Sequence, residues 1–343
     1  MVPFAAAGFP TTPPRLALAR LPTPVEPMAR LSAELGVRID IKRDDLTGLL
    51  LSGNKVRKLE FVLADARQQG ATALITCGGV QSNHARATAV AGARLGLRTI
   101  LLLKRSGPAR AVGGGPAGAS LPDGNLFLDS LVGAEIRFID DAAYENRDAV
   151  MEEVARELRA TGETPYVIPE GASNALGAWG YVAMVDELLE LAPGFPWTRI
   201  ICAVGSGGTL AGLLLGCRRR GLTSRVRGYS VHRTPEYFAR QVGTILEDFV
   251  RRFGADPSLR DAEIEIVGGF EGPAYAEVYP EEVEIIRHVA RLEGVALDPV
   301  YTGKAFTGMV SDIRTGRLPR DERILFLHTG GLYGLLAQRE SFL

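Results

Sequence analysis

The residues best suited to chemistry lie in the segment 52–60, Ser-Gly-Asn-Lys-Val-Arg-Lys-Leu-Glu. In this segment Lys55 follows a Gly-Asn pair and begins a run with the apolar spacing of a helix. A lysine in the first turn of a helix lies near unpaired N–H groups and the positive end of the helix dipole, which both disfavour its charged form. An amine that loses its proton easily can attack a carbonyl carbon and form a Schiff base. The alternative for this lysine taken alone is a solvated surface position, as for most lysines. Two glycine-containing turns farther along the chain favour the reactive interpretation.

The first of these turns is the segment 76–84, Thr-Cys-Gly-Gly-Val-Gln-Ser-Asn-His, which joins a predicted strand to a predicted helix. Ligands of open α/β sheets bind at the carboxyl ends of the strands, and this segment follows such an end. Ser82 and Asn83 are good N-caps, and a helix that starts there offers free N–H groups to an anion such as a carboxylate. The alternative is a helix cap without a ligand.

The second turn is the segment 204–212, Val-Gly-Ser-Gly-Gly-Thr-Leu-Ala-Gly, again between a predicted strand and a predicted helix. Its glycines let backbone N–H groups approach a phosphate, and Ser206 and Thr209 add hydroxyl donors. A dinucleotide fingerprint would need a third glycine where Leu210 stands, and a nucleotide P-loop would need a Gly-Lys-Ser/Thr ending, which is absent. The pattern therefore predicts a cradle for one phosphate, although similar turns also occur unoccupied.

Two polar segments in the C-terminal third could complete a site. Tyr301 and Thr302 follow an Asp-Pro turn and bring two hydroxyl groups into a predicted loop, and a His-Thr-Gly-Gly segment (328–331) follows the last predicted strand. Each of these alone fits a structural role. The histidines have no metal-ligand spacing and the three cysteines are widely separated, so we expect no metal, no disulfide and a reducing cytosol.

One ligand would satisfy all of these features together. It would carry an aldehyde for the lysine, a single phosphate for the glycine turn, and a polar ring. Pyridoxal 5′-phosphate has these groups. The sequence therefore predicts a pyridoxal-phosphate site beside a carboxylate site for a small amino-acid substrate.

The elements that must position these residues alternate between strands and helices along the chain. The predicted strands are 37–42, 73–76, 99–103, 135–139, 166–169, 198–204, 225–231 and 324–328, with Gly78-Gly79 breaking the second. The predicted helices are 28–35, a helix from Lys55 onward, 83–96, 125–132, 144–161, 177–191, 209–220, 237–253 and 280–293. We expect 106–124, which is rich in Gly, Pro, Ala and Ser, to be a mobile surface loop.

This alternation predicts an α/β fold of two domains, each an open, mostly parallel twisted sheet flanked by helices. A length of 343 residues also favours two domains. We assign residues 1–57 and 173–343 to a large, cofactor-binding domain and residues 58–172 to a small domain.

Composition argues against several other classes of protein. The 46% hydrophobic and 23% charged content is that of an ordinary soluble globular protein. A net charge of -1 without a basic or acidic block argues against nucleic acid and anionic membranes as partners. The longest apolar runs are too short to span a membrane, and the N-terminus lacks the basic and apolar regions of a signal peptide. We therefore expect a cytoplasmic protein.

In combination the motifs are specific for a known group of enzymes. The chain resembles the pyridoxal-phosphate-dependent enzymes of the tryptophan synthase β-like fold. Within them it resembles the group that holds D-cysteine desulfhydrase, 1-aminocyclopropane-1-carboxylate (ACC) deaminase and L-cysteate sulfo-lyase. The matching stretches are 42–45, 53–60, 81–84, 124–125, 166–169, 205–212, 298–304 and 328–331.

The resemblance implies which residues hold the cofactor. Lys55 would be the Schiff-base lysine, and Asn83 would bond the ring hydroxyl. Thr302 would lie beside the pyridine nitrogen, where ACC deaminase carries a glutamate. The phosphate would lie among residues of the glycine turn, with Lys58 as a second partner: Gly205, Ser206, Gly207, Gly208 and Thr209.

The resemblance also implies a substrate site and a homodimer. Ser82, Asn83 and His84 would hold the substrate carboxylate, and Tyr275 and Tyr301 would flank the substrate. Two stretches depart from the family pattern. The segment 273–279 lacks the glycines that flank the family's tyrosine, which bears on substrate choice, and 171–174 is Gly-Ala-Ser-Asn rather than Gly-Gly-Ser-Asn.

The reaction we expect from this resemblance is α,β-elimination from D-cysteine, giving pyruvate, ammonia and sulfide, with Lys55 or a tyrosine taking the α-proton. The alternatives are ring opening of ACC and release of sulfite from L-cysteate. Thr302 favours elimination over ring opening, because a neutral hydroxyl cannot stabilise a protonated ring as a carboxylate does, and Thr329, where the deaminases have Leu, points the same way.

A catalytically silent amino-acid sensor is a hypothesis of another class, which the intact Lys55 and both anion-binding turns disfavour.

Overall fold

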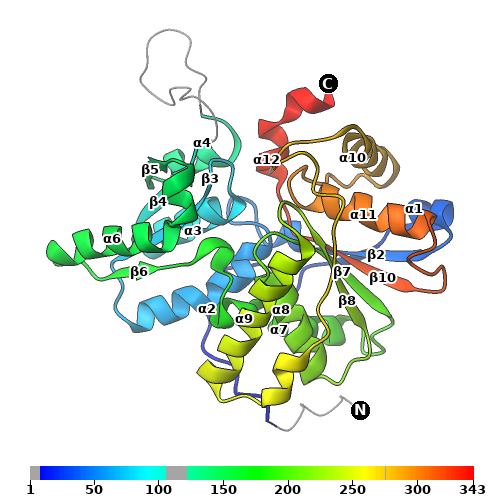
Figure 1. Cartoon of the computed structure of the whole chain (residues 1–343), viewed down its shortest axis with the longest axis horizontal. Helices are drawn as coiled ribbons and strands as arrows, with labels where there is room; N and C mark the ends of the chain where they lie inside the picture. The colour runs from blue at the N-terminus through cyan, green and yellow to red at the C-terminus, as the bar shows by residue number, and fades with distance from the viewer. Residues whose placement is uncertain (1–7, 106–121, 275) are drawn as a thin grey trace.

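The computed structural model describes residues 8–105, 122–274 and 276–343, and the strands in these ranges form two sheets (Figure 1). Most of the predicted loop 106–124, and Tyr275, lie outside the described residues. The larger sheet has the strand order β1 (Val25–Pro27), β2 (Arg38–Arg43), β10 (Arg323–His328), β7 (Arg199–Val204), β8 (Arg225–Ser230) and β9 (Glu265–Val267). The smaller sheet has the order β5 (Glu135–Ile139), β4 (Arg98–Lys104), β3 (Ala73–Gly79) and β6 (Pro165–Val167). Neighbouring strands are parallel except β1 and β2, which confirms the expected α/β class with mostly parallel sheets.

Helices cover both faces of each sheet (Figure 1). One face of the larger sheet packs on α7 (Ala175–Leu191), α8 (Gly208–Arg219) and α9 (Pro235–Phe253), and the other on α1 (Ala29–Leu35), α10 (Pro280–Glu293) and α11 (Thr302–Arg314). The smaller sheet packs on α6 (Arg147–Ala160) on one face and on α3 (Asn83–Leu95) and α4 (Gly124–Leu131) on the other. The helix α2 (Asn54–Gln68) packs on α7 and links the two halves of the molecule. The described chain also contains the short helices α5 (Asp141–Glu145) and α12 (Leu332–Ala337).

The strand β7 illustrates why both faces of the larger sheet are covered. Every residue of this strand is buried. Because successive side chains in a strand point to opposite faces, Ile200, Cys202 and Val204 enter the core under α7 and α8. Ile201 and Ala203 enter the core under α10 and α11. A continuous apolar run of this kind is typical of a central parallel strand.

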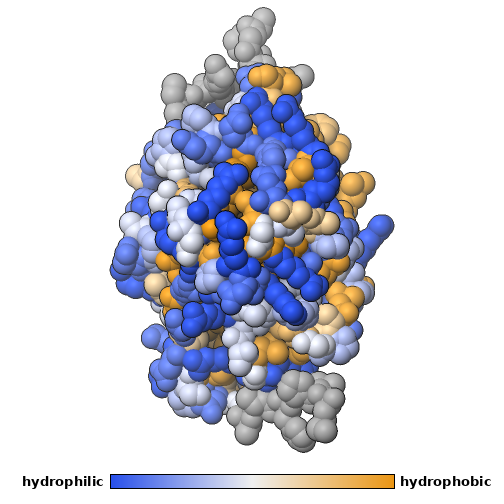
Figure 2. Space-filling model, turned by 90° about the vertical axis from the view of Figure 1, so that its right-hand side faces the viewer, coloured by the Kyte–Doolittle hydropathy of each residue, from blue (hydrophilic) through white to orange (hydrophobic). Residues whose placement is uncertain are grey.

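The surface over the α1 side of the molecule mixes hydrophilic and hydrophobic side chains without a long apolar belt (Figure 2). No helix within the described ranges is long and apolar enough to cross a membrane.

Three predicted elements differ from the structure. The helix predicted at 144–161 is two helices, α5 and α6, which meet at Asn146. The backbone leaves helical geometry there (φ -101°, ψ 23°), and the Asn146 side chain donates to the carbonyl of Ala142. Gly78-Gly79 does not break β3, which continues to Gly79 in register with β4.

The third difference concerns Tyr301 and Thr302, which were expected in a loop. The helix α11 begins at Thr302, with Tyr301 as its N-cap. The buried carboxylate of Asp298 accepts hydrogen bonds from the backbone N–H groups of Val300 (3.0 Å), Tyr301 (3.0 Å) and Thr302 (2.9 Å). A carboxylate in this position satisfies the unpaired N–H groups of the first turn and so starts the helix.

The two sheets draw their strands from different parts of the chain. Residues 25–43 and 199–328 supply the larger sheet, and residues 73–167 supply the smaller one. The assignment of residues 1–57 and 173–343 to a large domain and of residues 58–172 to a small domain stays a proposal. The boundary between residues 57 and 58 falls inside α2, which runs without a break through this point, so that boundary remains a proposal.

A buried network of charges holds α2 in place. Arg57 donates to Asp44 (Nε to Oδ2, 2.8 Å) and to Glu187 of α7 (Nη1 to Oε2, 2.8 Å), and Lys42 of β2 donates to Glu187 Oε1 at 2.5 Å. Tyr181 of α7 donates its hydroxyl to Asp44 at 2.7 Å. Arg57, Asp44 and Lys42 are almost completely buried. The network therefore joins the helix that carries Lys55 to a strand of the larger sheet and to α7.

We expect Glu187→Ala to destabilise the fold by about 3 kcal/mol or more, because it removes the hydrogen-bonded carboxylate partner of Lys42 and Arg57 and leaves Asp44 alone to balance two buried cations. Urea unfolding followed by circular dichroism measures this loss. The matched control is Glu152→Ala, which removes the exposed partner of Arg159 and should cost less than about 1 kcal/mol. Equal and small losses in the two variants would contradict the assigned role of the network.

Candidate active site

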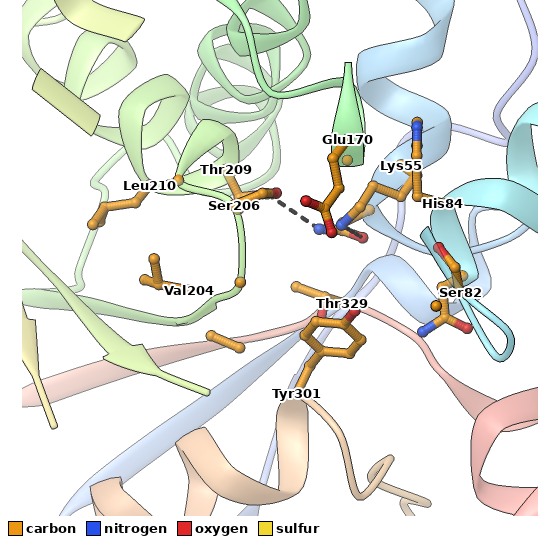
Figure 3. A pocket seen from close by; sticks show the side chains of 17 residues that line it. Lys55, Ser82, His84, Glu170, Val204, Ser206, Thr209, Leu210, Tyr301 and Thr329 are labelled. Carbon is orange, nitrogen blue, oxygen red and sulfur yellow. Dashed lines mark hydrogen bonds between the residues drawn. The ribbon is translucent and has the colours of Figure 1, made fainter. Parts of the chain in front are cut away.

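One pocket brings together five of the predicted segments at the carboxyl ends of strands from both sheets (Figure 3). Lys55 comes from the start of α2, and Tyr301 from the residue before α11. The start of α3 and the turn between β7 and α8 supply the anion-binding residues, and Thr329 comes from the turn after β10. The predicted residues among its lining are Lys55, Ser82, Asn83, His84, Gly205, Ser206, Gly207, Thr209 and Tyr301.

Lys55 is positioned by the backbone around Gly53. Gly53 has φ 91°, and a Cβ built on it would lie 2.9 Å from the carbonyl oxygen of Thr329, so that only glycine fits. The next residue, Asn54, donates its backbone N–H to the same oxygen at 3.0 Å. The side chain of Asn54 then accepts from Lys55 Nζ (3.1 Å) and donates to Thr209 Oγ1 (3.1 Å). Asn54 thus connects the lysine to the glycine turn.

The electrostatic surroundings of Lys55 favour the neutral amine. Burial lowers the pKa of Lys55 from its ordinary value to about 8, and the charges of Glu170 and Asp298 oppose this shift only in part. The ring of Tyr301 lies below the amine, with its centroid 5.9 Å from Nζ (Figure 3). An amine of this pKa is available as a nucleophile or a base near neutral pH.

The start of α3 has free donors where the carboxylate site was predicted. The Ser82 hydroxyl oxygen accepts from the backbone N–H of Ala85 at 3.1 Å, which leaves its hydrogen for a ligand. A Cβ on Gly78 would lie 2.5 Å from this oxygen, so the turn needs glycine there. Asn125 donates to Oδ1 of Asn83 at 3.0 Å and so orients the amide of Asn83, whose N–H groups can donate elsewhere.

His84 contributes to this site in a restricted way. Its Nε2 lies 2.8 Å from the Thr76 hydroxyl, and that hydroxyl donates its hydrogen to the carbonyl of Ile168. His84 must therefore carry the hydrogen on Nε2. Burial, helped by the charges of Lys55 and Lys58, holds the pKa of His84 well below its ordinary value, so the ring is neutral. Any contact of His84 with a carboxylate would come from its backbone N–H at the start of the helix.

The turn between β7 and α8 has the form of a phosphate cradle. Gly207 has φ 83°, a conformation that favours glycine, and it precedes the first turn of α8. Ser206 and Ser173 share a hydrogen bond between their hydroxyl groups at 2.8 Å, and the backbone N–H of Gly208 points to Ser173 at 3.3 Å. Free N–H groups and hydroxyl groups at a helix start are suited to a phosphate.

The comparisons with known proteins agree with this geometry. A family model described as "Pyridoxal-phosphate dependent enzyme" matches residues 16–330. The chain belongs to the pyridoxal-phosphate-dependent enzyme family. It is 42% identical to a "Putative 1-aminocyclopropane-1-carboxylate deaminase" of Thermotoga maritima over 94% of this chain and 98% of that protein.

Two further comparisons are informative. The chain is 39% identical to the "Bifunctional D-cysteine desulfhydrase/1-aminocyclopropane-1-carboxylate deaminase, mitochondrial" of Arabidopsis thaliana, over 93% of this chain and 78% of that protein. A crystal structure of an "ACC deaminase homologue" superposes with a TM-score of 0.84 and 37% identity, covering 98% of this chain and 96% of the other. An O-ureido-L-serine synthase, at 16% identity and a TM-score of 0.65, shares the fold.

The residues of the pocket fit the family's cofactor. Lys55 supplies an amine with a depressed pKa for the aldehyde, and Asn83 has amide donors for the ring hydroxyl. Only glycine fits at position 208, since a Cβ there would lie 2.7 Å from Ser173 Oγ and 2.9 Å from Lys58 Nζ, so the backbone of the turn lies close to these two polar groups. Together these groups match the aldehyde, the hydroxyl and the phosphate of pyridoxal 5′-phosphate.

Four predicted residues lie behind this lining or outside the described chain. Gly208 begins α8 and directs its backbone N–H to Ser173 Oγ at 3.3 Å. Lys58 donates to the carbonyl of Gly171 and to Ser173 Oγ, both at 3.1 Å, and so supports the cradle from behind. Thr302 is fully buried, and its hydroxyl donates to Asp298 Oδ1 at 2.7 Å. Its predicted contact with the pyridine nitrogen remains a proposal, as does the role of Tyr275, which is not described.

Two lining residues had no role in the sequence analysis. Asn54 was noted only as part of the Gly-Asn pair, and its contact with Thr209 depends on the tertiary structure. Glu170 points toward the same space as Lys55 (Figure 3) and is held by the hydroxyl of Tyr144 (2.5 Å) and by Arg147 (3.2 Å). No spacing in the sequence connects Glu170 with these partners, which come from α5 and α6.

The depressed pKa of Lys55 can be tested on the cofactor-free protein. Below about pH 8 its amine is protonated and unreactive, and above that value it is neutral. The rate of its modification by an amine-specific reagent should therefore level off above about pH 9, whereas a model lysine amine titrates near 10.4. Mass spectrometry of the labelled peptide measures the rate, and Lys55→Arg removes the signal. A rate that rises steadily through about pH 10 would contradict the assignment.

Proposed function

We propose that this pyridoxal-phosphate-dependent enzyme eliminates the β-substituent of a small amino acid, with D-cysteine as substrate and pyruvate, ammonia and sulfide as products. The observation that carries the proposal is the residue after Tyr301, a buried threonine where ACC deaminase has a glutamate. Thr329, another hydroxyl residue, also lines the pocket.

The residues of the pocket divide the work as follows in this proposal. The bound cofactor withdraws electrons from the bonds to the substrate's α-carbon. The start of α3 binds the carboxylate through Ser82 and the first backbone N–H groups of the helix. Lys55 Nζ, with a pKa near 8, takes the α-proton in its neutral form, and the Tyr301 hydroxyl is the alternative base.

In this proposal Thr302 faces the ring nitrogen, and an uncharged residue there favours elimination. A protonated ring nitrogen needs an opposite charge nearby, and Asp298, beside Thr302, has both oxygens occupied by local donors: the N–H groups of residues 300–302 and the Thr302 hydroxyl. Ring opening of ACC has no leaving group that takes up charge, so it depends more on a strong electron sink. Loss of sulfide depends on it less.

The second candidate is ACC deamination, because the relatives from Thermotoga maritima and Arabidopsis thaliana carry that activity in their names. Release of sulfite from L-cysteate is a weaker candidate, since the carboxylate of Glu170 in the pocket repels an anionic sulfonate. A silent sensor would not need Lys55 with a depressed pKa beside two anion sites.

We also propose that the enzyme acts as a homodimer in the cytoplasm. Supporting this, α4 and α12 pack together and expose large apolar side chains: Phe127, Leu131, Leu332 and Leu336. A group of exposed apolar residues on adjacent helices is typical of a protein interface. Light scattering of the purified enzyme measures the mass of the assembly.

A screen of substrates tests the function directly. We expect release of a 2-oxo acid from D-cysteine with kcat/KM at least about tenfold above the values for ACC, L-cysteine and cysteate. Lys55→Ala should lower turnover by orders of magnitude, since both the covalent attachment and the base are lost. Lys58→Ala, behind the cradle, should instead weaken retention of the cofactor. If wild type releases no 2-oxo acid from any of these amino acids or from β-chloroalanine, the enzyme assignment fails.

The role of Thr302 is tested by Thr302→Glu. The added carboxylate should shift the absorbance band of the bound cofactor and raise the ratio of ACC to D-cysteine turnover. Thr302→Val, which keeps the shape and removes the hydroxyl, is the matched control for burial at this position. Efficient ACC turnover by wild type, or a glutamate variant with an unchanged ratio and spectrum, would contradict the proposal.

A further inference from the structure

Lys304 is a buried cation whose partners are backbone carbonyl groups. It lies in the first turn of α11, two residues after Thr302, and is fully buried. Its Nζ donates to the carbonyl oxygens of Glu271 (2.5 Å), Ala274 (3.2 Å) and Val231 (3.4 Å). These oxygens come from two segments that are about forty residues apart in the chain, so the ammonium group joins three parts of the fold.

The joined segments border the active site. Val231 follows β8 and precedes His232, whose ring bonds the carbonyl of Gly205 in the glycine turn at 3.0 Å. The segment 271–274 immediately precedes Tyr275 in the sequence. It is tied to the sheet by the Glu271 side chain, which accepts from the Ser230 hydroxyl and from the N–H of Gly269 (2.7 Å).

The charge of Lys304 is compensated inside the fold. Burial lowers the pKa of Lys304, and the buried Glu282 of α10, Asp298 and Glu271 act in the opposite direction. Glu282 lies against the same helical turn, since a Cβ built on Gly303 would lie 2.9 Å from its Oε1. Three carbonyl oxygens that converge on one point resemble the oxygen ligands that proteins present to hard cations.

We propose that Lys304 is a positioning residue that acts as a tethered cation. Its ammonium group fixes the segment 271–274 against α11 and the end of β8. In the proposed function this segment leads directly into Tyr275, the residue proposed to flank the substrate, and this part of the inference rests on that function. Without the lysine side chain, the three carbonyl groups form a site for a small monovalent cation such as potassium or ammonium.

The test compares Lys304→Ala with wild type in potassium chloride and in tetramethylammonium chloride of equal ionic strength. The tetramethylammonium ion is too large for the site. In this salt, KM of Lys304→Ala for the amino acid should be about tenfold or more above that of wild type, with a smaller change in kcat. Potassium or ammonium ions should restore most of the loss in the variant and leave wild type unchanged. The matched control is Lys104→Ala, which removes a half-exposed lysine and should show no response to the cation.

Two measurements do not depend on activity. In the cofactor-free variant, potassium should raise the melting temperature relative to tetramethylammonium, and amide hydrogen exchange in 269–274 should be faster than in wild type until potassium is added. If Lys304→Ala does not fold, Lys304→Gln, which keeps two donors without the charge, replaces it in the same series. Unchanged KM and exchange, or losses that potassium does not reverse, would overturn the proposal.

These outcomes separate this inference from the proposed function. If wild type releases no 2-oxo acid from any amino acid, the proposed function fails, while melting and hydrogen exchange still report on the tethered cation. If wild type is active but the variant shows neither a change in KM nor a cation response, the function stands and the role of Lys304 fails.

Discussion

The position of Lys55 depends on the burial of Arg57 two residues farther along α2. Arg57 is held between Asp44 and Glu187, and Lys42 completes the network from the strand below. Charges this deep are stable only while every partner is in place. Because the partners come from a strand, a turn and a second helix, the network allows α2 a single position. A lysine that must meet a cofactor within ångströms needs a support of this rigidity.

The pocket also depends on two helices, α3 and α8, whose first turns line it. The first turns of α3 and α8 both present unpaired N–H groups, and Lys55 lies between them at the start of a third helix. Such surroundings attract anions and disfavour further positive charge. The pKa of Lys55 is lowered to about 8 mainly by its burial in the same pocket. The enclosed pocket that holds both anion sites therefore also makes the amine of Lys55 easier to deprotonate.

Sequence reasoning located the pocket residues that lie in continuous segments. The lysine after Gly-Asn and the strand–turn–helix at 204–212 were predictable because local geometry determines them. The start of α11 was not, because it depends on how the Asp298 carboxylate folds back onto the chain. Glu170 and Lys304 were missed as site residues for a related reason. Their partners lie tens of residues away, so no local pattern contains them.

The contact between Gly53 and Thr329 has a consequence for how such enzymes diversify. The start of α2 is tied to residue 329 through a backbone oxygen, so the tie does not depend on which side chain stands there. The side chain of Thr329 nevertheless lines the pocket. Mutation at this position can therefore alter which substrates are accepted without disturbing the lysine. An ancestral chain could explore new chemistry here while its catalytic scaffold stayed intact.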